Sequence, residues 1–168
     1  MPAPAVLKVG RTPTGHCLRI EGRGTMRESR AAAEFAARSL DAAGTTLVVD
    51  VSACDYLDST FLGCLVELHR KVVKQDRTRF GVHAPPDKAQ KLFAATRLDA
   101  VLRIVNEPPQ VIGEMVTLPA ADPASPDLMR HVMECHRRLA ELGGPQQAAF
   151  AAIADNLERE LESKRGSR

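Results

Sequence analysis

The pattern of apolar and polar residues along the first part of the chain predicts alternating strands and helices. Residues 5–9 and 16–21 each have an extended pattern, and the turn-forming residues 10–15 between them predict a β-hairpin. Residues 28–40 carry apolar side chains at helical spacing. Residues 45–51 are β-branched and apolar on both faces, as in a strand buried inside a sheet. This order of elements is typical of an α/β fold.

The alternation continues to residue 105. Asp58, Ser59 and Thr60 predict a helix start, because their side chains can cap free amide groups, and this helix extends to about Gln75. Strands are predicted at 78–83 and 101–105, with a helix starting at residues 85–87 between them. The pattern therefore predicts an α/β sheet of four to five strands with crossover helices packed on it.

The composition changes after Pro119, where residues 120–126 are small and proline-rich, as in a linker. Ser125 and Pro126 suit the cap and first position of a helix, and a second helix follows residues 143–145. We therefore predict a domain over 1–119, a linker over 120–126 and a two-helix extension over 127–168. The first of these helices carries a narrow apolar seam, formed by Leu128, Val132, Cys135, Leu139 and Leu142.

The seam must dock on the α/β domain or on another chain, because two amphipathic helices alone bury little apolar surface. Docking on another chain would make the protein a homo-oligomer through its C-terminal helices. The sequence leaves both possibilities open.

Composition and charge exclude several classes of function. The 168 residues include 23 Lys and Arg against 21 Asp and Glu, and a net charge of +2 does not indicate nucleic-acid binding. The apolar runs are too short to cross a membrane, and residues 1–4 do not have the pattern of a signal peptide. The four cysteines form no CxxC pair, which favours reduced thiols in a cytoplasmic protein.

Candidate catalytic and metal-binding residues are few. His69 lies on the same helix as Ser59 but about 15 Å away at 1.5 Å per residue, which excludes a local serine–histidine pair. His131, Cys135 and His136 could suggest a metal site, but a buried cysteine beside two solvated histidines is the favoured interpretation. We therefore expect no enzyme activity, no cofactor and no metal.

One stretch is more specific. In residues 47–63 a buried strand leads through a short loop to Asp58, Ser59 and Thr60 at a helix start. This stretch resembles the signature of the STAS domain, named after sulphate transporters and anti-sigma factor antagonists, in which Asp-Ser-[Ser/Thr]-Gly-Leu-Gly follows such a strand. The order of elements from Val6 to Pro119 matches that family too. The resemblance implies a STAS-like mixed sheet with crossover helices, here followed by an additional C-terminal helical hairpin.

The resemblance also implies a function. In antagonist members of the family the serine after the Asp is phosphorylated, which implies Ser59 as the phosphoacceptor, with Thr60 as a second candidate. The unmodified protein binds an anti-sigma factor that is also a serine kinase, and phosphorylation ends the binding until a phosphatase reverses it. This implies a cytoplasmic bacterial regulator of transcription. The implied partner-binding residues are Arg23, Gly24, Thr25, Asp58, Ser59, Thr60, Leu62 and Gly63.

The sequence departs from the family pattern at two places. Phe61 replaces the usual glycine after the Ser-Thr pair, and Gly22-Arg23-Gly24-Thr25 replaces an acidic stretch after the second strand. These departures bear on which partner is bound and on whether Ser59 is phosphorylated. The alternative function is a STAS scaffold or oligomerisation module that works without phosphorylation.

Overall fold

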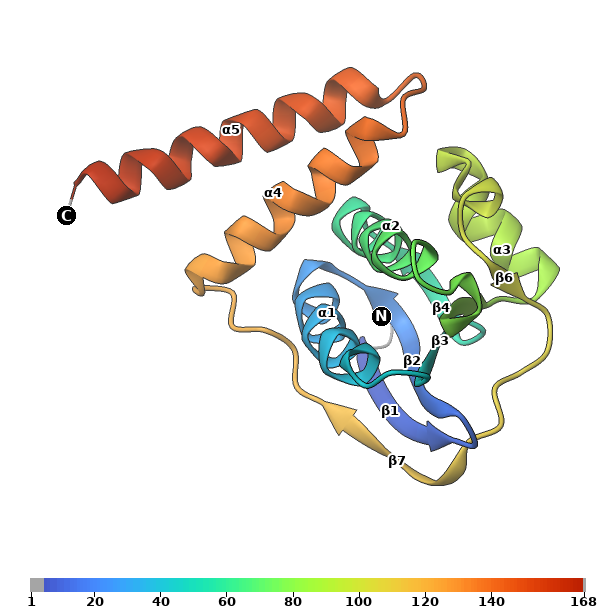
Figure 1. The fold of residues 1–168 in the computed structure, drawn as a ribbon. Helices are drawn as coiled ribbons and strands as arrows, with labels where there is room; N and C mark the ends of the chain where they lie inside the picture. Colours follow the sequence, from blue (N-terminus) through green and yellow to red (C-terminus); the bar gives the residue numbers. More distant parts are fainter. Residues whose placement is uncertain (1–4, 168) are drawn as a thin grey trace.

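The computed structural model describes residues 5–167. The amino-terminal residues 1–4, which bear on the signal-peptide prediction, and Arg168 at the end of the predicted extension lie outside the described residues. Within the described chain there is one sheet of seven strands with helices packed on it (Figure 1). The strands are β1 (Val6–Thr12), β2 (Gly15–Gly24), β3 (Thr46–Asp50), β4 (Cys54–Leu57), β5 (Phe80–His83), β6 (Ile104–Val105) and β7 (Ile112–Leu118).

The α-helices of the described chain are α1 (Met26–Asp41), α2 (Ser59–Val73), α3 (Pro86–Phe93), α4 (Pro126–Glu141) and α5 (Gln147–Gly166). Short 3₁₀ turns lie at Arg77–Arg79, Ala94–Thr96 and Leu98–Ala100. The predicted α/β class and the C-terminal pair of helices are confirmed.

The sheet has the strand order β6-β5-β3-β2-β1-β7. β1 pairs antiparallel with β2 and with β7, whereas β2, β3, β5 and β6 run parallel to one another and are joined by crossover connections. β4 lies off this path and pairs in parallel with the end of β2. The predicted number of strands was therefore too low, because β4 and β7 were not recognised as strands.

The second strand, predicted at residues 16–21, is longer in the structure, since β2 continues to Gly24. The register between β2 and β4 shifts between Gly22 and Arg23, and Gly22 has a φ of 75°. Glycine accepts this left-handed conformation without steric cost. The bulge lets β2 leave β3 and pair with β4, which brings its end to the start of α2.

The hydrophobic core lies between the sheet and helices α1, α2 and α3. Phe61, Phe80 and Phe93 are among its largest fully buried side chains, and the rest is mostly Leu and Val. Each such side chain contributes about 1.5–3 kcal/mol of stability through burial. Three of the five phenylalanines are thus used for packing in the core.

The helices α4 and α5, which we call the helical hairpin, form an outer layer. α4 packs on α2 and α1, on the side away from the sheet, and α5 packs on α4 (Figure 1). The seam predicted for this helix is largely used within the chain, since Leu128, Cys135 and Leu139 are buried there. The apolar surface that raised the possibility of a homo-oligomer is therefore mostly covered by the protein itself.

Candidate partner-binding site

The start of α2 is held by Asp58. One carboxylate oxygen, Oδ1, accepts a hydrogen bond from the Phe61 amide at 2.8 Å, which caps α2 as the sequence predicted. The other oxygen, Oδ2, accepts from the Met26 amide at the start of α1, also at 2.8 Å. Burial raises the pKa of Asp58, and the two amide hydrogen bonds act in the opposite direction. Asp58 thus ties the amino ends of two helices together.

The end of β2 lies beside this helix start. Gly24 pairs with Leu57 of β4, and the Gly24 carbonyl accepts a hydrogen bond from the Asp58 amide at 3.0 Å. The Arg23 guanidinium lies over the Tyr56 ring, with its carbon 4.1 Å from the ring centroid. The two separate segments predicted to form one surface, residues 23–25 and 58–63, are therefore adjacent.

The eight predicted partner-binding residues differ in exposure. Arg23 is exposed, while Thr25, Asp58 and Ser59 are half-buried. The remaining four, which are Gly24, Thr60, Leu62 and Gly63, are buried. Ser59 lies at the predicted helix start, and in the structure α4 covers part of this end.

Ser59 contacts a histidine from the helical hairpin. Its Oγ lies 2.9 Å from Nε2 of His136, and Nδ1 of the same ring lies 2.7 Å from the Val132 carbonyl oxygen. A carbonyl oxygen only accepts, so Nδ1 carries a proton, and with the proton there Nε2 of a neutral ring can accept a hydrogen bond from the Ser59 hydroxyl. The His136 ring is 4% exposed and packs against Phe150 of α5. The serine hydroxyl is thus bonded to a buried group 77 residues away.

A second histidine of α4, His131, makes a similar contact with a serine of α1. His131 Nε2 is hydrogen-bonded to the Ser29 hydroxyl, and the Cys135 sulfur lies 3.6 Å from the same nitrogen. Burial, with Arg30 and Lys71 adding smaller effects, lowers the pKa of His131 to about 4. His131 is therefore neutral at pH 7.

These observations correct one prediction. Cys135 is buried as expected, but His131 and His136 are buried too, at 6% and 4% exposure, and are not solvated. Among residues 5–167 no group of three or more histidine, cysteine or acidic side chains could hold a metal ion. The residues that suggested a metal site instead form contacts from α4 to α1 and α2.

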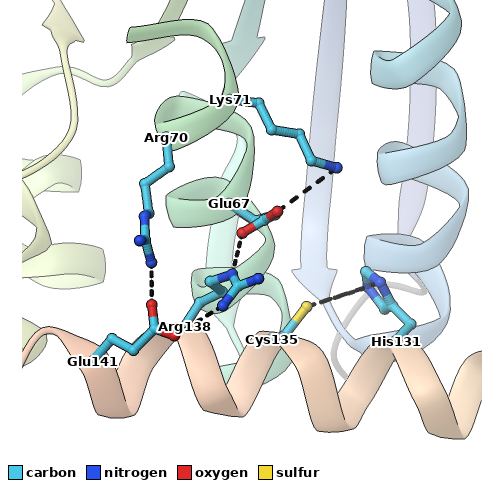
Figure 2. A network of polar contacts seen from close by, with 7 residues as sticks. All are labelled: Glu67, Arg70, Lys71, His131, Cys135, Arg138 and Glu141. Carbon is cyan, nitrogen blue, oxygen red and sulfur yellow. Dashed lines mark hydrogen bonds and ion pairs between the residues drawn. The ribbon is translucent and has the colours of Figure 1, made fainter. Parts of the chain in front are cut away.

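The contact between α2 and α4 continues as a chain of ion pairs, shown in Figure 2. Arg138 of α4 pairs with Glu67 of α2, and Arg70 of α2 pairs with Glu141 of α4. Arg138 also pairs with Glu141 at 2.9 Å. With Ser59 and Gly63, these contacts define an outer stripe of α2, consisting of Ser59, Gly63, Glu67 and Arg70.

Gly63 is the residue of the outer stripe at which the backbones of α2 and α4 come closest. A Cβ atom added there would lie 2.2 Å from the Cys135 carbonyl oxygen, so that only glycine allows the present approach of the two helices. The family motif has glycines in this region, but nothing in the sequence indicates that a helix about 70 residues later packs against one of them.

The helical hairpin does not fill all the space beside it. A groove of about 680 Å³ lies between α1, α2 and α4, and Cys64, His131 and Cys135 are among the residues that line it. Apolar side chains of α1 and α2, such as Ala37 and Val72, alternate with charged ones along this groove.

The comparisons with known proteins agree with this fold. The family model described as "Mlab, STAS domain" matches residues 7–106. Among solved structures, the crystal structure of an anti-sigma factor antagonist from Mycobacterium paratuberculosis is similar, with a TM-score of 0.53 and 22% sequence identity. The match covers 64% of this chain and 92% of that chain. A search of curated proteins finds no match.

The chain belongs to the STAS domain family, because the family model covers more than half of it. At its level of identity, the similarity to the antagonist structure shows the fold alone. The family match ends before β7 and the helical hairpin. None of the helices within residues 5–167 combines the length and hydropathy needed to span a membrane.

Proposed function

We propose that this protein is an anti-sigma factor antagonist that binds an anti-sigma factor with serine kinase activity through the surface around Ser59. Phosphorylation of Ser59 by that partner ends the binding, and a phosphatase restores it. The protein acts by association and not as an enzyme. Through the freed sigma factor it regulates transcription.

The observation that carries this proposal is the junction at Asp58. Its carboxylate and amide join the end of β2, the start of α1 and the start of α2 at one place. Arg23 and Tyr56 lie exposed beside this junction, and arginine and tyrosine are the residue types that are enriched in the centres of protein interfaces.

The chemistry of Ser59 suits a switch. A phosphate there adds nearly two negative charges at neutral pH, at the first residue of α2 and next to the Asp58 carboxylate. The helix dipole stabilises this charge in the free protein. A partner docked across Ser59 would have to desolvate both anions, which strongly opposes association.

Substitution of Ser59 tests the proposal. We expect Ser59→Asp to lose most of its affinity for the kinase-like partner, recovered from cell extract with the wild type, and Ser59→Ala to bind in the presence of ATP without being released. Ser163→Asp, at an exposed serine of α5, is the matched control and should bind like the wild type. Equal affinity of Ser59→Asp and Ser59→Ala, or phosphate found only elsewhere by mass spectrometry, contradicts the switch.

A further inference from the structure

The outer stripe of α2 is both part of the proposed partner-binding surface and the seat of α4. The Ser59 hydroxyl is hydrogen-bonded to His136, and Gly63 lies against the Cys135 backbone. Both residues belong to the surface proposed above. A partner that reaches Ser59 therefore meets the helical hairpin first.

The contact between α4 and the rest of the protein has a buried apolar part, which includes Cys135 and Leu139, and a polar edge along the outer stripe of α2. The Arg138–Glu67 pair is partly solvated, with 33% and 29% of the two side chains exposed, and Arg70 and Glu141 are about half exposed. Partly solvated ion pairs contribute little to stability. The groove between α1, α2 and α4 also leaves part of the contact unpacked. Interfaces between units of one chain are more polar than permanent interfaces, and such units can move relative to each other unless the interface is large and apolar.

The connection to α4 allows such movement. Residues 119–125 have no helix or strand. The segment is tied to α1 by two hydrogen bonds between Arg27 and Ala121, one from the Ala121 amide to the Arg27 carbonyl and one from the Arg27 side chain to the Ala121 carbonyl. Both lie at the surface, where hydrogen bonds exchange readily with water.

We propose that the helical hairpin is a removable cover on the partner-binding face of the STAS domain. This inference rests on the function proposed above. In the closed protein α4 occupies the outer stripe of α2, and the partner displaces it with an amphipathic helix of its own. Such a helix would carry a small residue opposite Gly63, a hydrogen-bond acceptor at Ser59, a cation at Glu67 and an anion at Arg70.

The cover and phosphorylation of Ser59 oppose each other. The Ser59 oxygen is 2.9 Å from the His136 ring, so a phosphoryl group cannot lie between them and phosphorylation removes the proton that the hydroxyl uses in this hydrogen bond. We therefore expect phosphorylated Ser59 to favour the open hairpin, and the closed hairpin to hinder access of the kinase to Ser59.

Two pairs of buried cysteines provide a test that needs no partner. Cys64 of α2 and Cys135 of α4 are buried beside the groove where α1, α2 and α4 meet, whereas Cys17 and Cys54 are buried in the sheet. Thiols react only when they are reached by solvent. Opening of the cover should expose Cys64 and Cys135 and leave Cys17 and Cys54 protected. The rate at which iodoacetamide labels each thiol, followed by mass spectrometry, therefore measures this opening.

The first variant is Gly63→Ala in the full chain. The added methyl group clashes with the Cys135 carbonyl and unseats α4, while alanine favours the α2 helix itself. We expect labelling of Cys64 and Cys135 to become at least about tenfold faster than in the wild type. Cys17 and Cys54 should keep their wild-type rates.

The second variant is Arg138→Glu, which places a third carboxylate beside Glu67 and Glu141. It should also open the cover and should speed phosphorylation of Ser59 by the partner kinase. The matched double variant, Arg138→Glu with Glu67→Arg, restores the opposite charges and should return labelling toward the wild-type rate.

Three results would contradict the proposal that the hairpin is a removable cover. These are unchanged labelling rates in both single variants, equally faster labelling at all four thiols, or a double variant whose thiols are labelled as fast as those of Arg138→Glu. Equal acceleration would mean that the whole domain unfolds. Because labelling requires no partner, the cover can fail while Ser59-dependent binding holds, and the binding can fail while the cover opens as expected.

Discussion

The two sides of helix α2 differ in the kind of contact that each makes with the rest of the protein. The inner side packs Phe61, Leu65 and Val72 into the core, where these side chains are at most 4% exposed. The outer side presents a hydroxyl, a glycine and two charged groups to α4. Apolar burial holds the inner contact, whereas the outer contact combines these polar groups of α2 with the buried Cys135 and Leu139 of α4 and therefore depends less on apolar burial. One helix thus serves as a structural element on one side and as a docking surface on the other.

The largest expected effect is on the inner side. Phe61→Ala leaves a cavity at a fully buried position and should lower the free energy of unfolding by about 3–5 kcal/mol. Ser59→Ala, two residues earlier on the outer side, removes one hydrogen bond and should cost only about 1 kcal/mol. Urea unfolding measures both, and a Ser59→Ala cost equal to that of Phe61→Ala would contradict the difference between the two sides.

The next effect is a pH dependence of the outer contact. Burial lowers the pKa of His131 from its ordinary value of 6.5 to about 4, so the undocked or unfolded chain binds this proton more readily than the closed protein. The stability that depends on neutral His131 is fully present above pH 6.5 and is lost as the pH falls toward 4, by up to about 3 kcal/mol. The groups that face this ring are Ser29 and Arg30 of α1, Lys71 of α2 and Cys135 of α4.

The variant His131→Gln isolates this titration. Glutamine does not titrate, so we expect the stability difference between wild type and variant, measured by urea unfolding, to move in the variant's favour between pH 7 and pH 4.5. Parallel pH profiles for the two proteins would show that His131 does not couple protonation to the fold.

The smallest effect concerns a single ion pair. Glu141→Gln removes the charge that pairs with Arg70 and Arg138 and should cost less than about 1 kcal/mol, because these side chains are partly solvated. Glu162→Gln, at an exposed position on α5, is the control and should have no effect. High salt should reduce the cost of Glu141→Gln further, and a cost that is independent of salt would contradict an ionic contribution.

Much of the fold could be predicted from local patterns. The hairpin of β1 and β2, the three crossover helices and the start of α2 at Asp58 each depend on side chains within a few residues of one another. β4 and β7 were missed for physical reasons. β4 has only four residues, two of them exposed, and β7 is a mostly exposed edge strand, so neither carries the apolar pattern of a buried strand.

The class of the fold, the capped helix start with Ser59 and the two amphipathic helices after residue 125 could be predicted from the amino-acid sequence, because they follow from periodicity and capping. The position of those helices on the protein depends on contacts between distant segments. The pairing of Ser59 with His136, and of Gly63 with the Cys135 backbone, joins positions more than 70 residues apart. No local pattern carries such a pairing, since it depends on how two helix surfaces fit together and on the absence of one methyl group at Gly63.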